Sequence, residues 1–286
     1  MTDTEKAIRV PVNRILPFSS VDGPGNRSVV FLQSCGFDCK YCHNPETRKM
    51  CTDCGACVPK CPTHALSIQN GKVKYDPSLC CRCDTCIRTC RNDASPRIQW
   101  MTSDEVCREV SAQMPFIRGM TVSGGECTTY PEFLTQLLGK CRKIGLTTLL
   151  DSNGSLLFQE YPELLDVTDG VMLDIKAWSR EDHIRVTGTD NGTVLKNMIY
   201  LAEKKKLYEV RTVVAPDLFD CEQTIRETAH ALKPYLNFSP IRYKIISYRP
   251  MGVRKEYSHL TVPSAAFMQQ LAETARSEGM RDIIII

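Results

Sequence analysis

Short apolar runs alternate with stretches of helical hydrophobic spacing along most of the chain. Six apolar runs predict strands, at 28–33, 119–123, 147–151, 170–175, 207–214 and 241–246. Six amphipathic stretches predict helices, at 102–113, 131–143, 157–165, 193–206, 221–233 and 264–277. Strands that alternate with helices in this way form a parallel sheet with helices outside it. The sequence therefore predicts an α/β fold.

Local signals agree with this alternation. Thr102 and Glu105 form a capping box at the start of one predicted helix, and Pro131 occupies the first turn of the next. Six βα units are fewer than the eight that close a TIM barrel. We therefore expect a partial, open (β/α)6 TIM-like barrel.

Residues 46–100 interrupt the first βα unit with two runs of four cysteines. The spacing matches the bacterial two-cluster ferredoxin, in which the fourth cysteine of each run binds the other run's cluster. We assign one 4Fe-4S cluster to Cys51, Cys54, Cys57 and Cys90, and a second to Cys80, Cys83, Cys86 and Cys61. A zinc ribbon is the alternative, but two complete four-cysteine runs fit it less well. Two departures are Arg91, which stands after Cys90 in place of proline, and Cys81, which could compete as a ligand.

Cys35, Cys39 and Cys42 form a third, shorter cysteine motif. Three thiolates can hold one face of a 4Fe-4S cubane and leave the fourth iron open, and metal sites that perform chemistry keep such a position. A zinc site is the alternative, but His43 directly follows Cys42 and is poorly placed as a fourth ligand. The spacing, with Tyr41 before the last cysteine, resembles the radical SAM superfamily, in which S-adenosylmethionine binds the open iron.

Composition limits the cellular compartments and the classes of partner that we expect for this protein. The formal net charge of +3 counts all 16 cysteines as neutral. Eleven thiolates around three oxidised cubanes would bring the net charge to about −2, which removes any indication of nucleic-acid binding. The sequence lacks the roughly 18 consecutive apolar residues of a membrane span, and its first residues lack the order of a secretory signal. We therefore expect a cytoplasmic protein with no nucleic-acid or membrane partner.

Polar and glycine-rich segments follow the predicted strands at their carboxyl ends, where barrels collect reactive groups. These are Ser123-Gly124-Gly125-Glu126, Asp151-Ser152-Asn153-Gly154, Asp174-Ile175-Lys176 and Arg249, together with Arg211, which lies within the fifth predicted strand. Each has an ordinary explanation as a turn or a surface charge. Together they suit S-adenosylmethionine: the glycines allow close backbone approach, Glu126 can accept from the ammonium or the ribose, and Lys176 can offset the carboxylate. Tyr41 can pack on the adenine.

Several of these motifs together resemble the glycyl-radical enzyme activating enzymes, and most closely the YjjW type. The motifs are Asp22-Gly23-Pro24-Gly25, the cysteine motif with His43-Asn44, Ser123–Glu126, Asp151–Gly154 and Met172–Lys176. The resemblance covers nearly the whole chain. It implies a radical SAM core formed by residues 1–45 and 101–286, with a ferredoxin-like α+β domain inserted at 46–100.

The resemblance also implies roles for individual residues. It assigns S-adenosylmethionine contacts to Gly124, Gly125, Glu126, Asp174, Lys176 and Arg211. Tyr41, His43, Asp151, Ser152 and Arg249 complete the candidate cofactor-binding set. In the pyruvate formate-lyase branch a monovalent cation binds beside the methionyl carboxylate, at positions that match Asp151, Ser152, Met172 and Asp174. This chain departs from that branch at Ser152, where threonine is frequent, and at Arg249, where the branch has histidine.

The implied activity is reductive cleavage of S-adenosylmethionine and transfer of the radical to a glycine of a partner enzyme, here a YjjI-like glycyl radical protein. Flavodoxin or ferredoxin would supply the electron. Two alternatives remain: a radical SAM enzyme acting on a small molecule or peptide, and an electron-transfer subunit that uses only the ferredoxin-like part. Of the cysteines left over, Cys107 and Cys141 are expected in the core, and packing is also favoured for Cys127.

Overall fold

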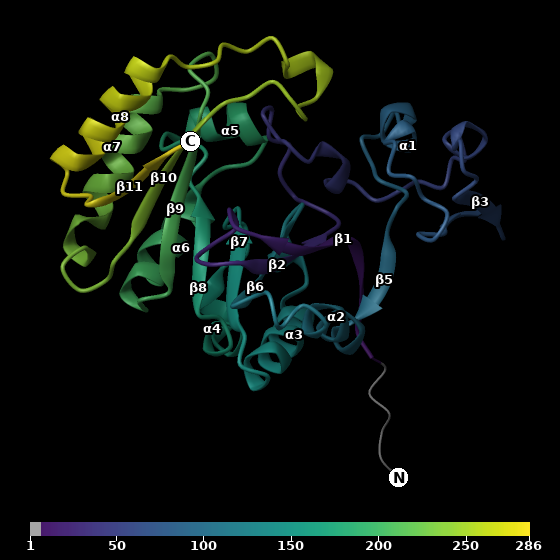
Figure 1. The fold of residues 1–286 in the computed structure, drawn as a ribbon. Coiled ribbons are helices and arrows are strands. Elements are labelled where there is room, and N and C mark those ends of the chain that lie inside the picture. Colours follow the sequence, from purple (N-terminus) through teal and green to yellow (C-terminus); the bar gives the residue numbers. More distant parts are fainter. Residues whose placement is uncertain (1–6) are drawn as a thin grey trace. The chain divides into compact units, whose positions relative to one another are not determined.

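The computed structural model describes residues 7–286, which fall into two compact units (Figure 1). The first unit comprises the chain up to Cys35 together with Asn44–Leu146. The second comprises Gly36–His43 and Thr147–Ile286. Within residues 7–286 no helix has the length and apolar character needed to cross a membrane.

The first unit is built on a four-stranded sheet in the order β6-β2-β1-β5. Its strands are β1 (Arg9–Ser19), β2 (Arg27–Leu32), β5 (Gln99–Thr102) and β6 (Gly119–Gly124). β2 and β6 are parallel, whereas β1 runs antiparallel to both β2 and β5. Every residue of β2 is buried. The helices α2 (Ser103–Ser111) and α3 (Pro131–Lys143) contact each other, and a 3-10 turn at Cys127–Thr129 follows β6.

The capping box predicted for α2 is confirmed. The Thr102 hydroxyl accepts from the backbone N–H of Glu105 at 3.2 Å, and the Glu105 carboxylate accepts from the N–H of Thr102 at 2.7 Å. Two N–H groups that would otherwise lack partners at the helix start are thus satisfied.

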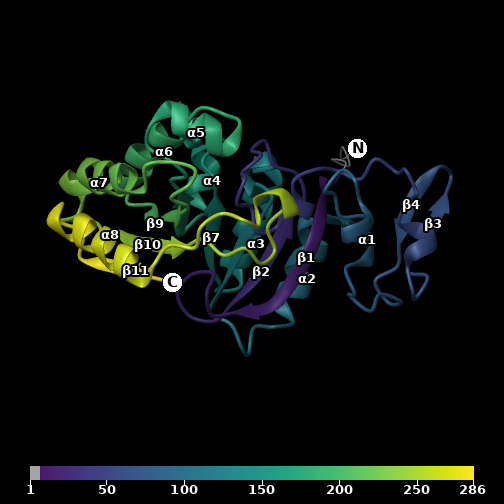
Figure 2. The same cartoon turned by 90° about the horizontal axis from the view of Figure 1, so that it is seen from above.

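The cysteine-rich segment of the first unit forms short elements of its own. These are the antiparallel hairpin of β3 (Leu66–Gln69) and β4 (Lys72–Tyr75), the helix α1 (Thr85–Thr89), and 3-10 turns at Pro45–Thr47 and Val58–Lys60. The hairpin and α1 lie together, apart from α2 and α3 (Figure 2). A small core of Cys57, Leu66 and Cys86 joins them. The two ends of the segment meet, because the N–H of Ser95 donates to the carbonyl of Glu46 at 2.8 Å.

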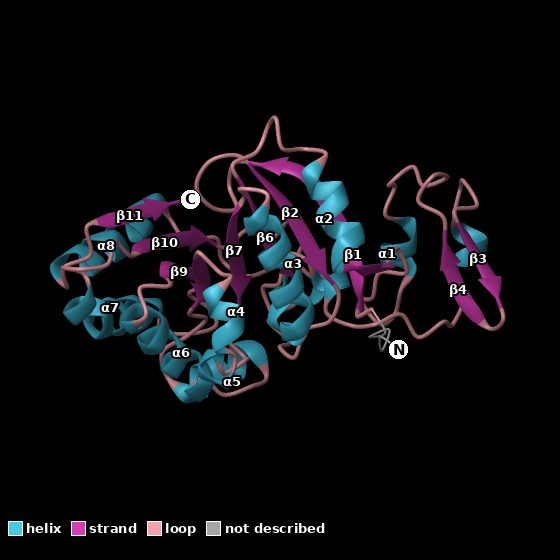
Figure 3. Ribbon diagram, turned by 90° about the horizontal axis from the view of Figure 1, so that it is seen from below, coloured by secondary structure: helices cyan, strands magenta, loops and turns pink. Residues whose placement is uncertain are grey.

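The second unit has five parallel strands in the order β11-β10-β9-β8-β7, all labelled in Figure 1 and drawn as magenta arrows among cyan helices in Figure 3. They are β7 (Thr147–Ser152), β8 (Gly170–Asp174), β9 (Leu207–Val214), β10 (Arg242–Ser247) and β11 (Asp282–Ile285). Its helices are α4 (Pro162–Asp166), α5 (Arg180–Thr187), α6 (Gly192–Glu203), α7 (Cys221–Leu232) and α8 (Ala265–Ser277). Short 3-10 turns lie at Phe158–Glu160, Lys233–Tyr235 and Lys255–Tyr257.

The predicted fold class is confirmed: the six expected strands form, and neighbouring ones within each unit pair in parallel. One predicted helix, 157–165, is wrong as a continuous element. The chain forms a 3-10 turn at Phe158–Glu160 and begins α4 at Pro162. Proline disfavours helical geometry at the residue before it, and Tyr161 accordingly has φ −130° and ψ 61°.

Candidate cluster and cofactor site

The loop Gly36–His43, which carries Cys39 and Cys42, is held by α5 of the same unit. The N–H groups of Asp38 and Lys40 donate to the carbonyls of Thr187 and Val186 at 2.7 and 3.0 Å. These carbonyls belong to the last turn of a helix, where carbonyl groups lack helical partners. The loop is therefore fixed by the end of a helix that the sequence analysis did not predict.

Side chains add to this attachment. The Phe37 ring meets the His183 ring of α5 edge-on, with centroids 5.4 Å apart. Arg254 forms an ion pair with Asp38 at 2.7 Å and donates to the carbonyl of Cys39 at 3.2 Å. Sequence reasoning missed Arg254 because its partners are more than 200 residues away along the chain.

Cys39 is buried beside the charged pair Asp174 and Lys176 at the carboxyl end of β8. Lys176 Nζ lies 2.8 Å from Asp174 Oδ2, and the Lys176 side chain is only 12% exposed. Burial raises the pKa of Cys39 to about 11, although the Lys176 ammonium lowers it. Burial works against the Lys176 ammonium, but the Asp174 carboxylate, with Cys39 and Tyr41, outweighs burial and raises the pKa of Lys176. A fixed positive charge therefore faces Cys39.

Tyr41 is part of the same arrangement. Its ring is buried, its hydroxyl donates to the carbonyl of Lys176 at 3.4 Å, and the Lys176 ammonium lies 5.9 Å from the ring centroid. The structure thus brings together Cys39, Tyr41, Asp174 and Lys176, four of the predicted site residues.

Arg211 on β9 joins two further predicted residues. Its guanidinium donates to Asp151 Oδ1 and to Met172 Sδ, each at 2.8 Å, and its Nε donates to Glu209 at 2.5 Å. Burial lowers the pKa of Arg211, but Asp151 and Glu209 outweigh it and raise the pKa. Glu209 was missed, although a carboxylate two residues from a predicted arginine on the same strand face was a readable signal.

Ser152, His43 and Arg249 have backbone partners in the structure. The buried Ser152 hydroxyl accepts from the N–H of Gly154 at 3.0 Å and so caps its own turn. The His43 ring lies 3.1 Å, at Nε2, from the backbone carbonyl of Arg249. The side chain of Arg249 is exposed. Contact between these residues and a cofactor stays a prediction.

In the first unit, backbone hydrogen bonds fix both Cys35 and the Gly124-Gly125-Glu126 segment. The N–H groups of Cys35 and Glu126 donate to the carbonyls of Arg48 and Ser34 at 2.9 and 2.7 Å. A Cβ on Gly125 would lie 2.3 Å from the Ser34 carbonyl oxygen. The glycine is therefore needed for packing within the protein, a reason that the sequence analysis did not give.

Glu126 is buried and already has partners of its own. Its Oε1 accepts from the N–H of Thr128 at 3.0 Å and from the Thr128 hydroxyl at 2.6 Å. Gly124 has φ +128°, and a Cβ there would lie 2.1 Å from the Leu32 carbonyl. Because Cys35 belongs to the first unit and Cys39 and Cys42 to the second, common ligation by all three stays a prediction.

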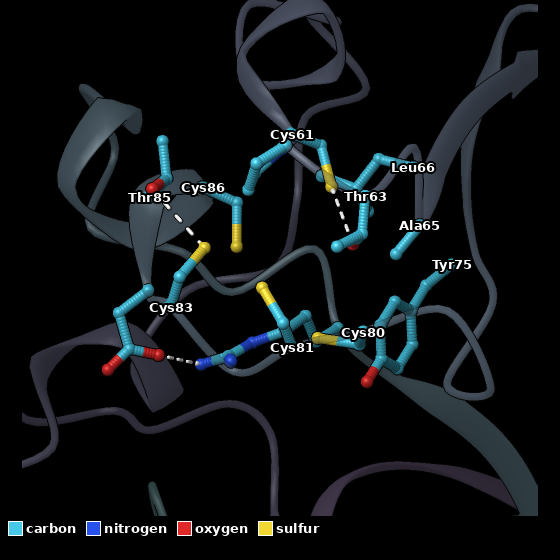
Figure 4. A pocket seen from close by; sticks show the side chains of 13 residues that line it. Cys61, Thr63, Ala65, Leu66, Tyr75, Cys80, Cys81, Cys83, Thr85 and Cys86 are labelled. Carbon is cyan, nitrogen blue, oxygen red and sulfur yellow. Dashed lines mark hydrogen bonds and ion pairs between the residues drawn. The ribbon is translucent and has the colours of Figure 1, made fainter.

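The cysteine-rich segment contains a pocket whose lining includes one complete predicted ligand set (Figure 4). Cys61, Cys80, Cys83 and Cys86 line it, and so does Cys81. Cys61 comes from the first run and the other three from the second, as the crossed ferredoxin assignment requires. Ligation of a cluster by these four thiolates stays a prediction.

Hydrogen bonds to sulfur repeat between the two runs. The N–H of Asp53 donates to Cys51 Sγ, and the N–H of Arg82 to Cys80 Sγ, both at 3.4 Å. Both donors have left-handed backbone, with φ 57° and 55°. Burial raises the pKa of Cys61, but N–H groups of Thr63, Ala65 and Leu66 and the Thr63 hydroxyl outweigh it and lower the pKa. Such donors stabilise a thiolate and tune cluster potentials.

Within residues 7–286, no three His, Cys, Asp or Glu side chains converge closely enough to bind a single metal ion.

Comparison with known proteins decides the family. Residues 29–229 match the model of the radical SAM superfamily. The chain belongs to the radical SAM superfamily. This superfamily implies a 4Fe-4S cluster and S-adenosylmethionine, and the three-cysteine motif lies within the matched residues.

Two relatives align with most of this radical SAM enzyme. The pyruvate formate-lyase-activating enzyme of Streptococcus mutans is 31% identical, with 88% of this chain and 82% of the relative covered. The indoleacetate decarboxylase activating enzyme of Tractidigestivibacter scatoligenes is 27% identical, with 99% and 100% covered. The chain is thus a radical SAM enzyme of the group that contains the glycyl-radical enzyme activating enzymes.

A solved structure supports the fold. A domain of a pyruvate-formate lyase-activating enzyme from Bacteroides vulgatus superimposes with a TM-score of 0.51 and 23% identity. The match covers 59% of this chain and 98% of that domain.

Proposed function

We propose that this protein is a radical SAM activase that installs a glycyl radical on a partner enzyme. The observation that carries the proposal is the burial of Cys39 beside the Lys176–Asp174 pair, in a chain whose relatives are named activating enzymes. Cys35, Cys39 and Cys42 would hold the catalytic cluster. When bound, this cluster and S-adenosylmethionine supply a 5′-deoxyadenosyl radical, which removes a hydrogen from a glycine Cα of the partner.

The protein's own residues bind and orient S-adenosylmethionine. Lys176 supplies a positive charge that is fixed by Asp174 and shielded from solvent, and this suits the carboxylate of the methionyl group. Gly124, Gly125 and Glu126 form the segment beside the Cys35 loop, and we assign them to the amino-acid end of the ligand. Tyr41, His43, Asp151, Ser152, Asp174, Arg211 and Arg249 complete the proposed site. Because the cofactor carries the difficult chemistry, orientation and exclusion of water are the protein's tasks.

The proposal extends to two auxiliary clusters in a ferredoxin-like domain at 46–100. The pocket lined by Cys61, Cys80, Cys83 and Cys86 supports one of them. The repeated N–H to sulfur bonds at Cys51 and Cys80 support a second, equivalent one. The hydrogen bond between Ser95 and Glu46 supports an insertion, because inserted domains begin and end at neighbouring points.

The partners follow from the same assignment. We assign a YjjI-like glycyl radical protein as the protein substrate, and flavodoxin or ferredoxin as the electron donor. Sixteen free cysteines suit the reducing cytoplasm, where thiolates persist. The YjjW type remains the proposed subgroup.

Replacement of one catalytic cysteine tests the proposal. We expect Cys39→Ala to lose S-adenosylmethionine cleavage and to retain the two auxiliary clusters, with about eight irons of twelve by ligand count. The measurement combines iron content with release of 5′-deoxyadenosine under chemical reduction. Cys107→Ala, on α2 outside every predicted ligand set, is the matched control and should keep both. Cleavage by Cys39→Ala at the wild-type rate would refute the assignment of the catalytic cluster.

A further inference from the structure

Four residues were expected to surround a monovalent cation, and the structure gives each of them a partner within the protein. Arg211 contacts Asp151 and Met172, Lys176 pairs with Asp174, and the Ser152 hydroxyl accepts from a backbone N–H. These four residues therefore do not fit the role of ligands to a bound cation.

The strand register explains why Arg211 reaches this position. Asp151, Met172 and Glu209 stand side by side across β7, β8 and β9. Arg211 lies two residues beyond Glu209, so its side chain projects from the same face of β9. Its Nε and both terminal nitrogens contact this row. The guanidinium is thus held at Nε by its own strand and at its two terminal nitrogens by β7 and β8.

The charges around this row are already balanced. The carboxylate of Glu209, only 1% exposed, lies 2.5 Å from Arg211 and 3.1 Å from Lys244. Asp151 pairs with Arg211, and Asp174 with Lys176. These three carboxylates face Arg211, Lys176 and Lys244, while Arg242, 4.0 Å from Glu209, also pairs with Asp282. A monovalent cation beside Asp151 and Met172 would meet the guanidinium at short range in a buried site, where like charges repel strongly.

We propose that the Arg211 guanidinium replaces the monovalent cation in this protein, with Glu209 as the positioning residue that holds it. The proposal rests on the proposed function, since it assigns the charge that faces bound S-adenosylmethionine. Arginine is suited to this task because it stays charged and its planar fork makes several directed contacts. S-adenosylmethionine binding is therefore independent of potassium or sodium.

Calorimetric titration of the reconstituted, unreduced protein with S-adenosylmethionine tests this. Buffers contain potassium chloride or, at equal concentration, choline chloride, whose bulky cation cannot enter the site. For the wild type we expect dissociation constants in the two salts to agree within about twofold. Arg211→Ala removes the guanidinium and frees Asp151 and Met172, so potassium should tighten binding by about fivefold or more.

Three further variants test the inference with a retained charge, with an unrelated arginine and with loss of the positioning carboxylate. Arg211→Lys retains a positive charge and should bind without potassium dependence. Arg226→Ala removes an arginine that is paired with Glu222 on the exposed face of α7, and should behave as the wild type. Glu209→Gln should weaken binding in both salts, because Arg211 keeps its ion pair with Asp151 but loses the carboxylate that holds its Nε.

Two outcomes would overturn the inference: fivefold or stronger potassium dependence in the wild type, or identical binding by Arg211→Ala in both salts. Failure of the proposed function has a different signature. It would appear as normal S-adenosylmethionine binding and cleavage without a glycyl radical on any partner. The dissociation constants in potassium chloride and choline chloride could still be compared in that case.

Discussion

A glycine in a predicted ligand site can allow close approach of a ligand or close packing of the protein backbone. At Gly125 the structure shows the second of these. Its missing side chain leaves room for the carbonyl oxygens of Ser34 and Thr47, which a Cβ would approach to 2.3 and 2.6 Å. Both neighbours are backbone atoms of the segments that flank the Cys35 loop, and backbone cannot move aside as a flexible side chain can. The sequence supplied the glycine pair, but only the structure supplies this reason for it.

We therefore predict that Gly125→Ala destabilises the protein even without any ligand. Overpacking in a rigid surrounding costs about 1–3 kcal/mol, and we expect a lowered free energy of unfolding in that range or above. The measurement is denaturant unfolding of the protein under anaerobic conditions. Gly36→Ala is the control, because a Cβ at Gly36 meets nothing within 4 Å. Equal stability of the two variants would contradict the packing role.

At the scale of elements, the strands with strong apolar runs were predictable and those with mixed signals were not. β1 escaped prediction because it contains Pro11 and Pro17, which argue against a strand. The structure accommodates Pro17 at a register shift between Leu16 and Ser19 in the pairing with β2. β5 has only the four residues Gln99–Thr102 and is recognisable only through its pairing with β1.

In the candidate site, too, some features could be predicted from the sequence and others could not. Motifs such as Cys35–Cys42 are encoded within a few residues and could be predicted from the sequence. The support provided by α5, Arg254 and Glu209 depends on contacts between distant segments, and no local pattern reveals such contacts. The two residues most informative about the cation, Arg211 and Glu209, could be paired only once the strand register was known.

The insert is predicted to be a separable element with respect to S-adenosylmethionine binding. Cys83→Ala removes one of the four predicted ligands that line the pocket of Figure 4 and should cost one auxiliary cluster, about four irons by ligand count. Binding of S-adenosylmethionine should stay within about twofold of the wild type, because the proposed ligand contacts lie outside 46–100. Iron analysis and calorimetric titration measure the two effects. Loss of binding in both Cys83→Ala and Cys54→Ala would show that the insert is not separable.

At the scale of the whole molecule, the backbone connects the insert directly to a predicted ligand of the catalytic cluster. The N–H of Cys35 donates to the carbonyl of Arg48 at 2.9 Å, and the buried Arg48 side chain forms an ion pair with Asp93 near the end of the insert. Cys51 follows Arg48 by three residues, which span at most about 11 Å. A cluster held by Cys51 would therefore lie close enough to Cys35 to serve as an electron carrier.

We predict on this basis that the auxiliary clusters relay electrons to the catalytic cluster. Cys54→Ala should cleave S-adenosylmethionine normally in a single turnover when its catalytic cluster is reduced chemically beforehand, because the catalytic ligands are intact. With reduced flavodoxin or ferredoxin as the donor, the same variant should turn over slowly, since one carrier is missing. Release of 5′-deoxyadenosine measures both reactions, and Cys107→Ala again serves as the control. Normal turnover of Cys54→Ala with the protein donor, accompanied by failure to form the glycyl radical, would contradict the relay and assign the insert to docking of the partner enzyme.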